Sequence, residues 1–181
     1  MSAPVILASQ SPRRKELLAR MCVPFTVDVA DVDEHCPGDA HTLVKTLARR
    51  KAEAVSARHP GETVIGADTV VLLEKILGKP RDEAEAFAML KSLSGRWHEV
   101  YTGVCVITPQ GICEGVEVTR VHFTEMTDAE VARCVAMGDL LDKAGAYAIQ
   151  GITGMYIDRV EGCPYNVMGL PLALTRRLLL L

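Results

Sequence analysis

A short polar segment near the N-terminus, Ser9-Gln10-Ser11-Pro12-Arg13-Arg14, follows directly on an apolar stretch. Ser11 and Pro12 are residue types that begin a helix, as its N-cap and its first residue. Two arginines in the first helical turn conflict with the positive end of the helix dipole. A bound anion would remove this conflict, because guanidinium groups and free N–H groups both donate to phosphate. The segment therefore indicates either a phosphate site or a solvated turn with two ordinary arginines.

One carboxylate interrupts a strongly apolar run. Asp68 lies within Val64-Ile65-Gly66-Ala67-Asp68-Thr69-Val70-Val71, a pattern typical of a strand that is covered on both faces. An unpaired carboxylate in such a strand would be costly or would become protonated. Asp68 therefore needs a Lys or Arg partner, a metal ion, or exposure in a cleft. Acids of this kind concentrate at active sites, and the alternative is a buried structural ion pair.

Two lysines stand in unusual surroundings. Lys51 shares a helix stripe with Leu47 and Val55, where an apolar residue is expected. Its long side chain could simply reach solvent past them. Lys79 lies in Leu77-Gly78-Lys79-Pro80, which lacks the first glycine and the Ser/Thr of a P-loop. Lys79 could bind a phosphate or be an ordinary lysine in a turn.

A segment rich in small residues, Asp142–Gly151, could contact a nucleobase. Small residues let the backbone approach a ligand, Tyr147 could stack on a base, and the Gln150 amide could read a base edge. The chain contains neither the glycine pattern of a Rossmann dinucleotide site nor the Gly-x-Ser-x-Gly of serine hydrolases.

Together these segments supply cations for a polyphosphate and acids for a divalent cation. The cations are Arg13, Arg14, Lys51 and Lys79, and the acids are Asp33, Glu34 and Asp68. Mg²⁺ is commonly held by one or two carboxylates together with substrate phosphates, so this set of residues suits a metal-dependent phosphoryl reaction.

The elements that must position these residues alternate between strand and helix, which predicts an α/β fold. We expect strands at 5–8, 25–29, 63–73, 98–108 and 155–160, with a turn at 109–111 leading into a further strand that ends at 123. We expect a first helix to begin at 12 and a second to cover 41–58. A third follows the capping pair Asp82 and Glu85 and ends at Gly95, and a fourth follows the capping box of Thr127 and Glu130. A final helix begins at about 171 and ends in Leu178–Leu181.

Size and composition fit one globular domain spanning residues 1–181. The chain has a mass of 19.6 kDa, 49% hydrophobic residues and a net charge of −3, which disfavours a general nucleic-acid coat. No apolar run approaches the ~20 residues of a membrane span, and no basic region precedes the first apolar segment, so we expect a cytoplasmic protein without a membrane partner. Its 6 cysteines form no C-x-x-C pair, and we expect them reduced and mostly in the core.

An ordered set of motifs running from about Ile6 to Leu172 resembles the Maf family. The motifs are Ser9-x-Ser11-Pro12-Arg13-Arg14, Glu34, Ala48-x-x-Lys51-Ala52, Gly66-Ala67-Asp68-Thr69, Gly78-Lys79-Pro80, Leu93-Ser94-Gly95 with His98 and Thr102, Asp142-Lys143-Ala144-Gly145-Ala146-Tyr147, Gln150-Gly151 and Asn166-x-x-Gly169-Leu170-Pro171. This resemblance implies a mixed, twisted β-sheet flanked by helices with a smaller lobe and a cleft between lobes, the fold shared with inosine-triphosphate pyrophosphatases.

The resemblance also implies an activity: cleavage of a nucleoside triphosphate between its α and β phosphates, with Mg²⁺ or Mn²⁺. Asp68 matches the proton acceptor, and Arg13, Thr69 and Gln150 match positions associated with base selection, as in the dTTP/UTP branch. The implied phosphate-neutralising residues are Arg13, Arg14, Lys51 and Lys79, with Ser9 also at the substrate. We expect Glu34 and Asp68 to hold the metal, and Asp68 could be base, ligand or both.

The Gln150 amide offers one donor and one acceptor, which suits the O4 and N3–H edge of uracil or thymine. Two alternatives stay open: a pyrophosphatase for 7-methyl-GTP or another modified nucleotide, and a non-catalytic nucleotide-binding regulator of septum formation. The resemblance further suggests a homodimer.

Overall fold

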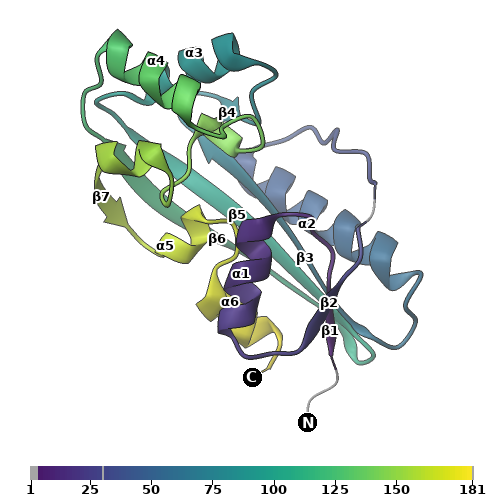
Figure 1. Ribbon diagram of the computed structural model, residues 1–181. Coiled ribbons are helices and arrows are strands. Elements are labelled where there is room, and N and C mark those ends of the chain that lie inside the picture. The colour runs from purple at the N-terminus through teal and green to yellow at the C-terminus, as the bar shows by residue number, and fades with distance from the viewer. Residues whose placement is uncertain (1–3, 30, 181) are drawn as a thin grey trace. The chain divides into compact units, whose positions relative to one another are not determined.

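The structure is a computed structural model that describes residues 4–29 and 31–180 (Figure 1). Its strands form a seven-stranded mixed sheet in the order β2-β1-β3-β5-β6-β7, with β4 beside β3. The strands are β1 (Val5–Leu7), β2 (Phe25–Val27), β3 (Thr63–Leu72), β4 (Ile76–Leu77), β5 (Trp97–Thr108), β6 (Gly111–Phe123) and β7 (Ile157–Glu161). β1 runs parallel to β2 and β3, whereas β4 pairs antiparallel with β3 and β7 antiparallel with β6. The predicted α/β class with a mixed sheet flanked by helices is confirmed.

The chain divides into two compact units. Unit 1 comprises Met1–Thr69, Thr102–Glu117 and Gly169–Leu181, and unit 2 comprises Val70–Tyr101 and Val118–Met168. Unit 1 contains the helices α1 (Pro12–Arg20), α2 (Ala40–Ser56) and α6 (Leu172–Leu178). Unit 2 contains α3 (Glu83–Leu93), α4 (Asp128–Met137) and α5 (Pro164–Val167), together with the 3₁₀ helices η1 (Ala144–Ala146) and η2 (Ile152–Tyr156).

The predicted strands and long helices are present, with ends that differ by a few residues. β4 and α5 escape prediction because they are too short to show a period. The last strand begins at Ile157 rather than at Met155, because Met155 belongs to the 3₁₀ helix η2, which ends at Tyr156. Thr153 of this helix bonds both the N–H and the carbonyl of Ala148. The final helix ends at Leu178, and Leu181 lies outside the described residues.

Two of the predicted helix starts are confirmed in detail. The Ser11 side chain accepts from the Arg14 N–H at the start of α1, and α4 begins with a complete capping box between Thr127 and Glu130. At α3 the prediction is only half right. Asp82 caps the helix, but the Glu85 carboxylate accepts from the Arg81 N–H instead of the N–H of the capping residue.

Two glycines allow α2 to pack directly on the sheet of unit 1. A Cβ atom at Gly66 of β3 would lie 2.2 Å from the Ala48 carbonyl oxygen, and one at Gly103 of β5 would lie 2.3 Å from the Val44 carbonyl oxygen. No side chain fits at either point, so α2 lies against β3 and β5 at backbone contact (Figure 1). Gly66 lies two residues before Asp68 in β3. The close approach of α2 to β3 at Gly66 therefore also sets the distance between α2 side chains and the Asp68 carboxylate.

The core of unit 2 contains a cluster of three rings. His98, Phe123 and Tyr147 have ring centroids 5.1–5.6 Å apart. The Tyr147 hydroxyl lies 2.8 Å from His98 Nε2, while His98 Nδ1 has no hydrogen-bond partner among the described residues. Burial lowers the pKa of His98 to about 4 and raises the pKa of Tyr147 well above its ordinary value. His98 is therefore a neutral core residue at physiological pH.

The cysteines only partly follow prediction. All six are free, but only Cys105 and Cys134 are buried, so the expectation that most lie in the core is wrong. Burial raises the pKa of the Cys105 thiol to about 12, which makes it unreactive. In the described part of the chain, no helix combines the length and the apolar character that a membrane crossing requires.

Substituting Gly66 tests the contact between α2 and β3. Gly66→Ala should lower the free energy of unfolding by about 3 kcal/mol, because the added methyl group meets backbone atoms that cannot rotate away. The measurement is urea denaturation. Gly78→Ala is the matched control, since a Cβ there meets nothing within 4 Å and should leave stability almost unchanged. Equal stability of the two variants would contradict the packing argument.

The buried histidine predicts a pH dependence of stability. As pH falls from about 6.5 to about 4, the unfolded chain protonates His98 before the folded protein does, so stability should fall by up to about 3 kcal/mol. Denaturation curves at pH 7, 6 and 5 measure this slope. In His98→Phe, which keeps a ring beside Phe123, the slope over this window should be smaller; an unchanged slope would show that other groups cause it.

Candidate functional site

An ion pair between Lys51 of α2 and Asp68 of β3 is the centre of the charged residues in unit 1. Lys51 Nζ donates to Asp68 Oδ1 at 2.6 Å, and the two side chains are only 16% and 12% exposed. The predicted need of Asp68 for compensation is thus met by a lysine. The interpretation that Lys51 merely reaches solvent is wrong, because α2 packs so closely on β3 that the carboxylate lies within reach.

A second carboxylate approaches the same ammonium group. Glu34 Oε1 lies 3.0 Å from Lys51 Nζ, and the Glu34 side chain is 61% exposed. The cluster of Lys51, Asp68 and Glu34, called the acid–lysine cluster below, therefore extends from a buried strand to the surface.

The acid–lysine cluster offers ligands of the type that a divalent cation needs. Its two carboxylates already face one cation, the Lys51 ammonium, and carboxylate oxygens are the hard donors that Mg²⁺ and Mn²⁺ take. Within residues 4–29 and 31–180, no group of three or more His, Cys, Asp or Glu side chains could hold a metal. Asp33 instead accepts from the His35 N–H at 2.8 Å.

Arg14 of α1 connects three other parts of unit 1. Its Nε donates to the Gly169 carbonyl at 2.7 Å, its Nη1 to Ser9 Oγ at 3.2 Å, and its Nη2 to Thr69 Oγ1 at 3.0 Å. Burial lowers the pKa of Arg14, while the negative charge of Asp68 opposes this effect. The sequence predicts an unfavourable interaction between the Arg14 charge and the positive end of the α1 dipole. The three protein oxygens that accept from Arg14 offset part of it.

The Thr69 hydroxyl is held from two sides. It lies 2.9 Å from the hydroxyl of Thr102, which is fully buried, and it accepts from Arg14. Gly169 has φ +102°, and a Cβ there would lie 3.4 Å from both Arg14 Nε and Thr69 Oγ1. Glycine thus provides both the backbone conformation and the space that this arrangement needs. Arg13 lies beside Arg14 in the first turn of α1 and is half-buried.

In unit 2, the loop that carries Lys79 is bonded to the segment that carries Gln150. The Gly145 N–H donates to the Gly78 carbonyl at 3.0 Å. Gly145 has φ +68°, and a Cβ there would lie 2.9 Å from the Val71 side chain. The side chains of Lys79 and Gln150 are both exposed. The prediction that Tyr147 could stack on a base is wrong, because this residue is 5% exposed in the core beside His98.

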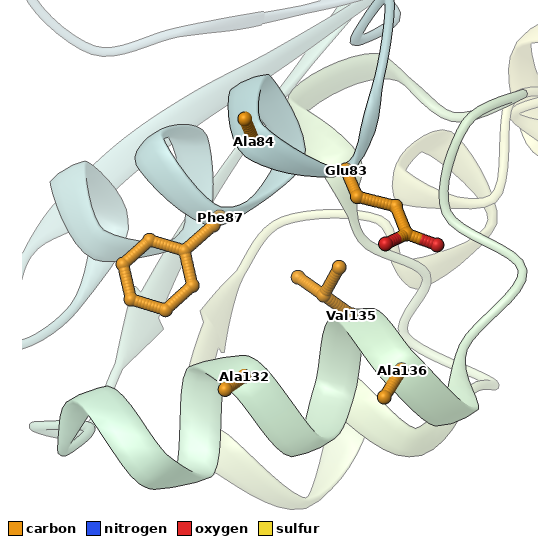
Figure 2. A pocket seen from close by; sticks show the side chains of 6 residues that line it. All are labelled: Glu83, Ala84, Phe87, Ala132, Val135 and Ala136. Atoms are coloured by element: carbon orange, nitrogen blue, oxygen red, sulfur yellow. The ribbon is translucent and has the colours of Figure 1, made fainter.

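An open groove of about 450 Å³ in unit 2 contains none of the predicted site residues. Figure 2 shows the side chains of Phe87 and Val135 between α3 and α4, with the Glu83 carboxylate at one end. Its lining is completed by Ala84, Ala132 and Ala136. Apart from Glu83 the lining is apolar, and it carries no positive charge, so this groove does not suit a phosphate.

The family model for Maf-like proteins matches residues 4–180. The chain belongs to the Maf family. It is 51% identical to a dTTP/UTP pyrophosphatase of Deinococcus radiodurans over 177 residues, 97% of this chain and 91% of that protein. It is also 51% identical to a dTTP/UTP pyrophosphatase of Myxococcus xanthus over 178 residues, 97% of this chain and 90% of that protein. Among solved structures, the Ham1 protein of Staphylococcus aureus matches 67% of this chain and 72% of its own, with 15% identity and a TM-score of 0.49.

Within each unit, the structure brings together residues that the Maf motifs single out. Unit 1 joins Ser9, Arg14 and Thr69 by hydrogen bonds and Glu34, Lys51 and Asp68 by ion pairs. Unit 2 carries Lys79 and Gln150 on segments that Gly78 and Gly145 connect.

The residue types alone do not predict the contacts of Gly169, Thr102 or Arg50. Gly169 accepts from Arg14, Thr102 lies beside Thr69, and Arg50 donates to the backbone carbonyls of Asp33 and His35. The first two appear in the motifs, and the Gly169-Leu170-Pro171 sequence does signal a special backbone turn. Arg50 lies outside the motifs. Its contacts depend on the position of the segment before α2 in the folded chain, which no local sequence pattern predicts.

Proposed function

We propose that this Maf protein hydrolyses dTTP and UTP between the α and β phosphates and releases the nucleoside monophosphate and pyrophosphate. The observation that carries the proposal is the acid–lysine cluster, found in a chain about half identical to dTTP/UTP pyrophosphatases over nearly its whole length. Such a cluster combines an acid that can take a proton with a cation that can neutralise phosphate.

Asp68 takes the proton in this reaction. A water oxygen attacks the α phosphorus, the bond from that phosphorus to the bridging oxygen breaks, and pyrophosphate leaves with the bond's electron pair. Asp68 Oδ1 is bonded to Lys51, whereas Oδ2 has no hydrogen bond to any described residue, so Oδ2 is the atom that accepts the water proton.

Glu34 and Asp68 are the residues that would hold Mg²⁺ or Mn²⁺. When bound, the metal supplies charge neutralisation and polarisation of the phosphate being attacked. Lys51 supplies part of the same neutralisation from the protein, together with Arg13, Arg14 and Lys79, and the Ser9 hydroxyl also binds the substrate.

Thr69 and Gln150 select the base, together with Arg13. The exposed Gln150 amide carries one donor and one acceptor group, which match the O4 and N3–H edge that thymine and uracil share. The Thr69 hydroxyl is fixed by Arg14 and Thr102, so it can discriminate rather than adapt. A glutamate in place of Gln150 would instead suit the donor-rich edge of a guanine such as 7-methylguanine.

The two units act together as one domain in this proposal, because a single family model spans residues 4–180. We place the enzyme in the cytoplasm, where dTTP and UTP are made and used, and we infer a homodimer.

The proton-acceptor role predicts the effect of removing the Asp68 charge. Asp68→Asn should reduce the turnover of dTTP and UTP about 10³-fold, the range lost with a general base. Pyrophosphate release from a panel of nucleotides, 7-methyl-GTP included, with Mg²⁺ measures this. Glu53→Gln, on α2 but paired with Arg49, is the control that should keep full activity.

Each other outcome of this assay contradicts part of the proposal. Activity of Asp68→Asn within tenfold of wild type would exclude Asp68 as proton acceptor. If the wild type turns over 7-methyl-GTP in preference to dTTP, the protein is instead a pyrophosphatase for 7-methyl-GTP. Wild-type protein that binds nucleotides without releasing pyrophosphate from any of them would favour the regulator.

Base selection predicts a separate effect at Gln150. Gln150→Glu should reduce kcat/KM for dTTP about 10²-fold, because the charged side chain loses the donor that faces the base carbonyl. Thermal unfolding should not change, since the side chain is exposed. Gln110→Glu, an exposed glutamine in the β5–β6 turn, is the matched control. A parallel loss of activity and thermal stability in Gln150→Glu would count against base reading.

A further inference from the structure

The segment that carries Glu34 has little structure of its own. Residues 31–39 between β2 and α2 contain no helix or strand, and most of their side chains are exposed. A carboxylate on such a segment would sample many positions, and ordering it would cost free energy each time a ligand bound. The position of Glu34 beside Lys51 therefore needs an anchor outside the segment.

Arg50 provides that anchor. Its Nη1 donates to the Asp33 carbonyl at 2.8 Å and to the His35 carbonyl at 2.9 Å. These two carbonyls belong to the residues on either side of Glu34. The Asp33 carboxylate also accepts from the His35 N–H at 2.8 Å, which closes a turn around Glu34. One guanidinium group thus fixes the backbone at the point where the carboxylate branches off.

Consecutive residues of α2 hold the two parts of Glu34. Arg50 binds the backbone on both sides of it, and Lys51 binds its carboxylate. Neighbouring helix residues point about 100° apart, so Arg50 can reach the segment while Lys51 also reaches Asp68. The preceding residue, Arg49, takes no part, because it pairs with Glu53 on an exposed face of the helix.

We propose that Arg50 is a positioning residue that holds Glu34 ready to bind the divalent cation. This inference rests on the proposed function, in which Glu34 and Asp68 hold the metal. Arg50 does not touch the metal or the nucleotide. It removes the cost of ordering the Glu34 segment, as outer residues commonly do for the ligands of metal sites.

Removal of the guanidinium group tests this role. In Arg50→Met, which keeps most of the aliphatic stem, the affinity for Mn²⁺ should fall about tenfold. The free Mn²⁺ signal in electron paramagnetic resonance, recorded during titration of the whole protein with Mn²⁺ alone, measures the affinity. Hydrogen exchange of the amides in 31–39 should also become faster. Arg49→Met is the matched control and should change neither, while Arg50→Lys should retain most of the affinity because an ammonium can donate to both carbonyls.

A double-mutant cycle separates this role from general stabilisation. If Arg50 acts through Glu34, Arg50→Met should weaken Mn²⁺ binding in the wild-type background but have no further effect in Glu34→Gln. Two outcomes would overturn the inference while leaving the metal site in place. One is an equal loss of Mn²⁺ affinity on Arg50→Met in both backgrounds. The other is a Mn²⁺ affinity of Arg50→Met within twofold of that of Arg49→Met. Wild-type Mn²⁺ binding that Glu34→Gln does not alter, or no Mn²⁺ binding by the wild type, would overturn the proposed metal ligands and this inference with them.

Discussion

The contact between α2 and β3 is the constraint on which the charged residues of unit 1 depend. Lys51 can bond Asp68 at 2.6 Å only because Gly66 and Gly103 let the helix approach the sheet to backbone contact. A side chain at either position would lift α2 and leave the Asp68 carboxylate without its partner in an apolar strand, where an uncompensated charge is costly. The two glycines therefore explain how an apolar strand tolerates an acid.

The hydrogen bonds of Arg14 show a second way in which charge is used inside unit 1. A guanidinium group carries donors in a fixed plane, and here three of them bond oxygens of Ser9, Thr69 and Gly169. The hydroxyl of Thr69 is held further by Thr102. Because each partner comes from a different stretch of the chain, Arg14 turns separate segments into one fixed arrangement beside the proposed substrate.

The sequence predicts best those features that nearby residues decide. Capping residues such as Ser11 and Thr127 and the apolar pattern of β3 act over a few positions, so the elements follow from them. Features that depend on distant partners do not. Lys51 looks like a surface lysine until Gly66 brings β3 close, and Tyr147 looks like a base-stacking residue until His98 is found beside it. The residues alone single out Asp68 as an acid that needs compensation and Gln150 as an amide that could read a base edge. The proposed role of Asp68 as proton acceptor came from the family resemblance, since no local pattern distinguishes a catalytic acid from a buried ion pair.

The bond from Arg14 to Gly169 has a consequence for the synthesis of the chain. Arg14 leaves the ribosome early, whereas its acceptor is made only after the whole of unit 2. Until Gly169 emerges, the guanidinium lacks one of its three oxygen partners, and Thr69 is held by a less constrained arginine. A nascent Maf chain thus completes this part of its interior only after the whole of unit 2 has been made.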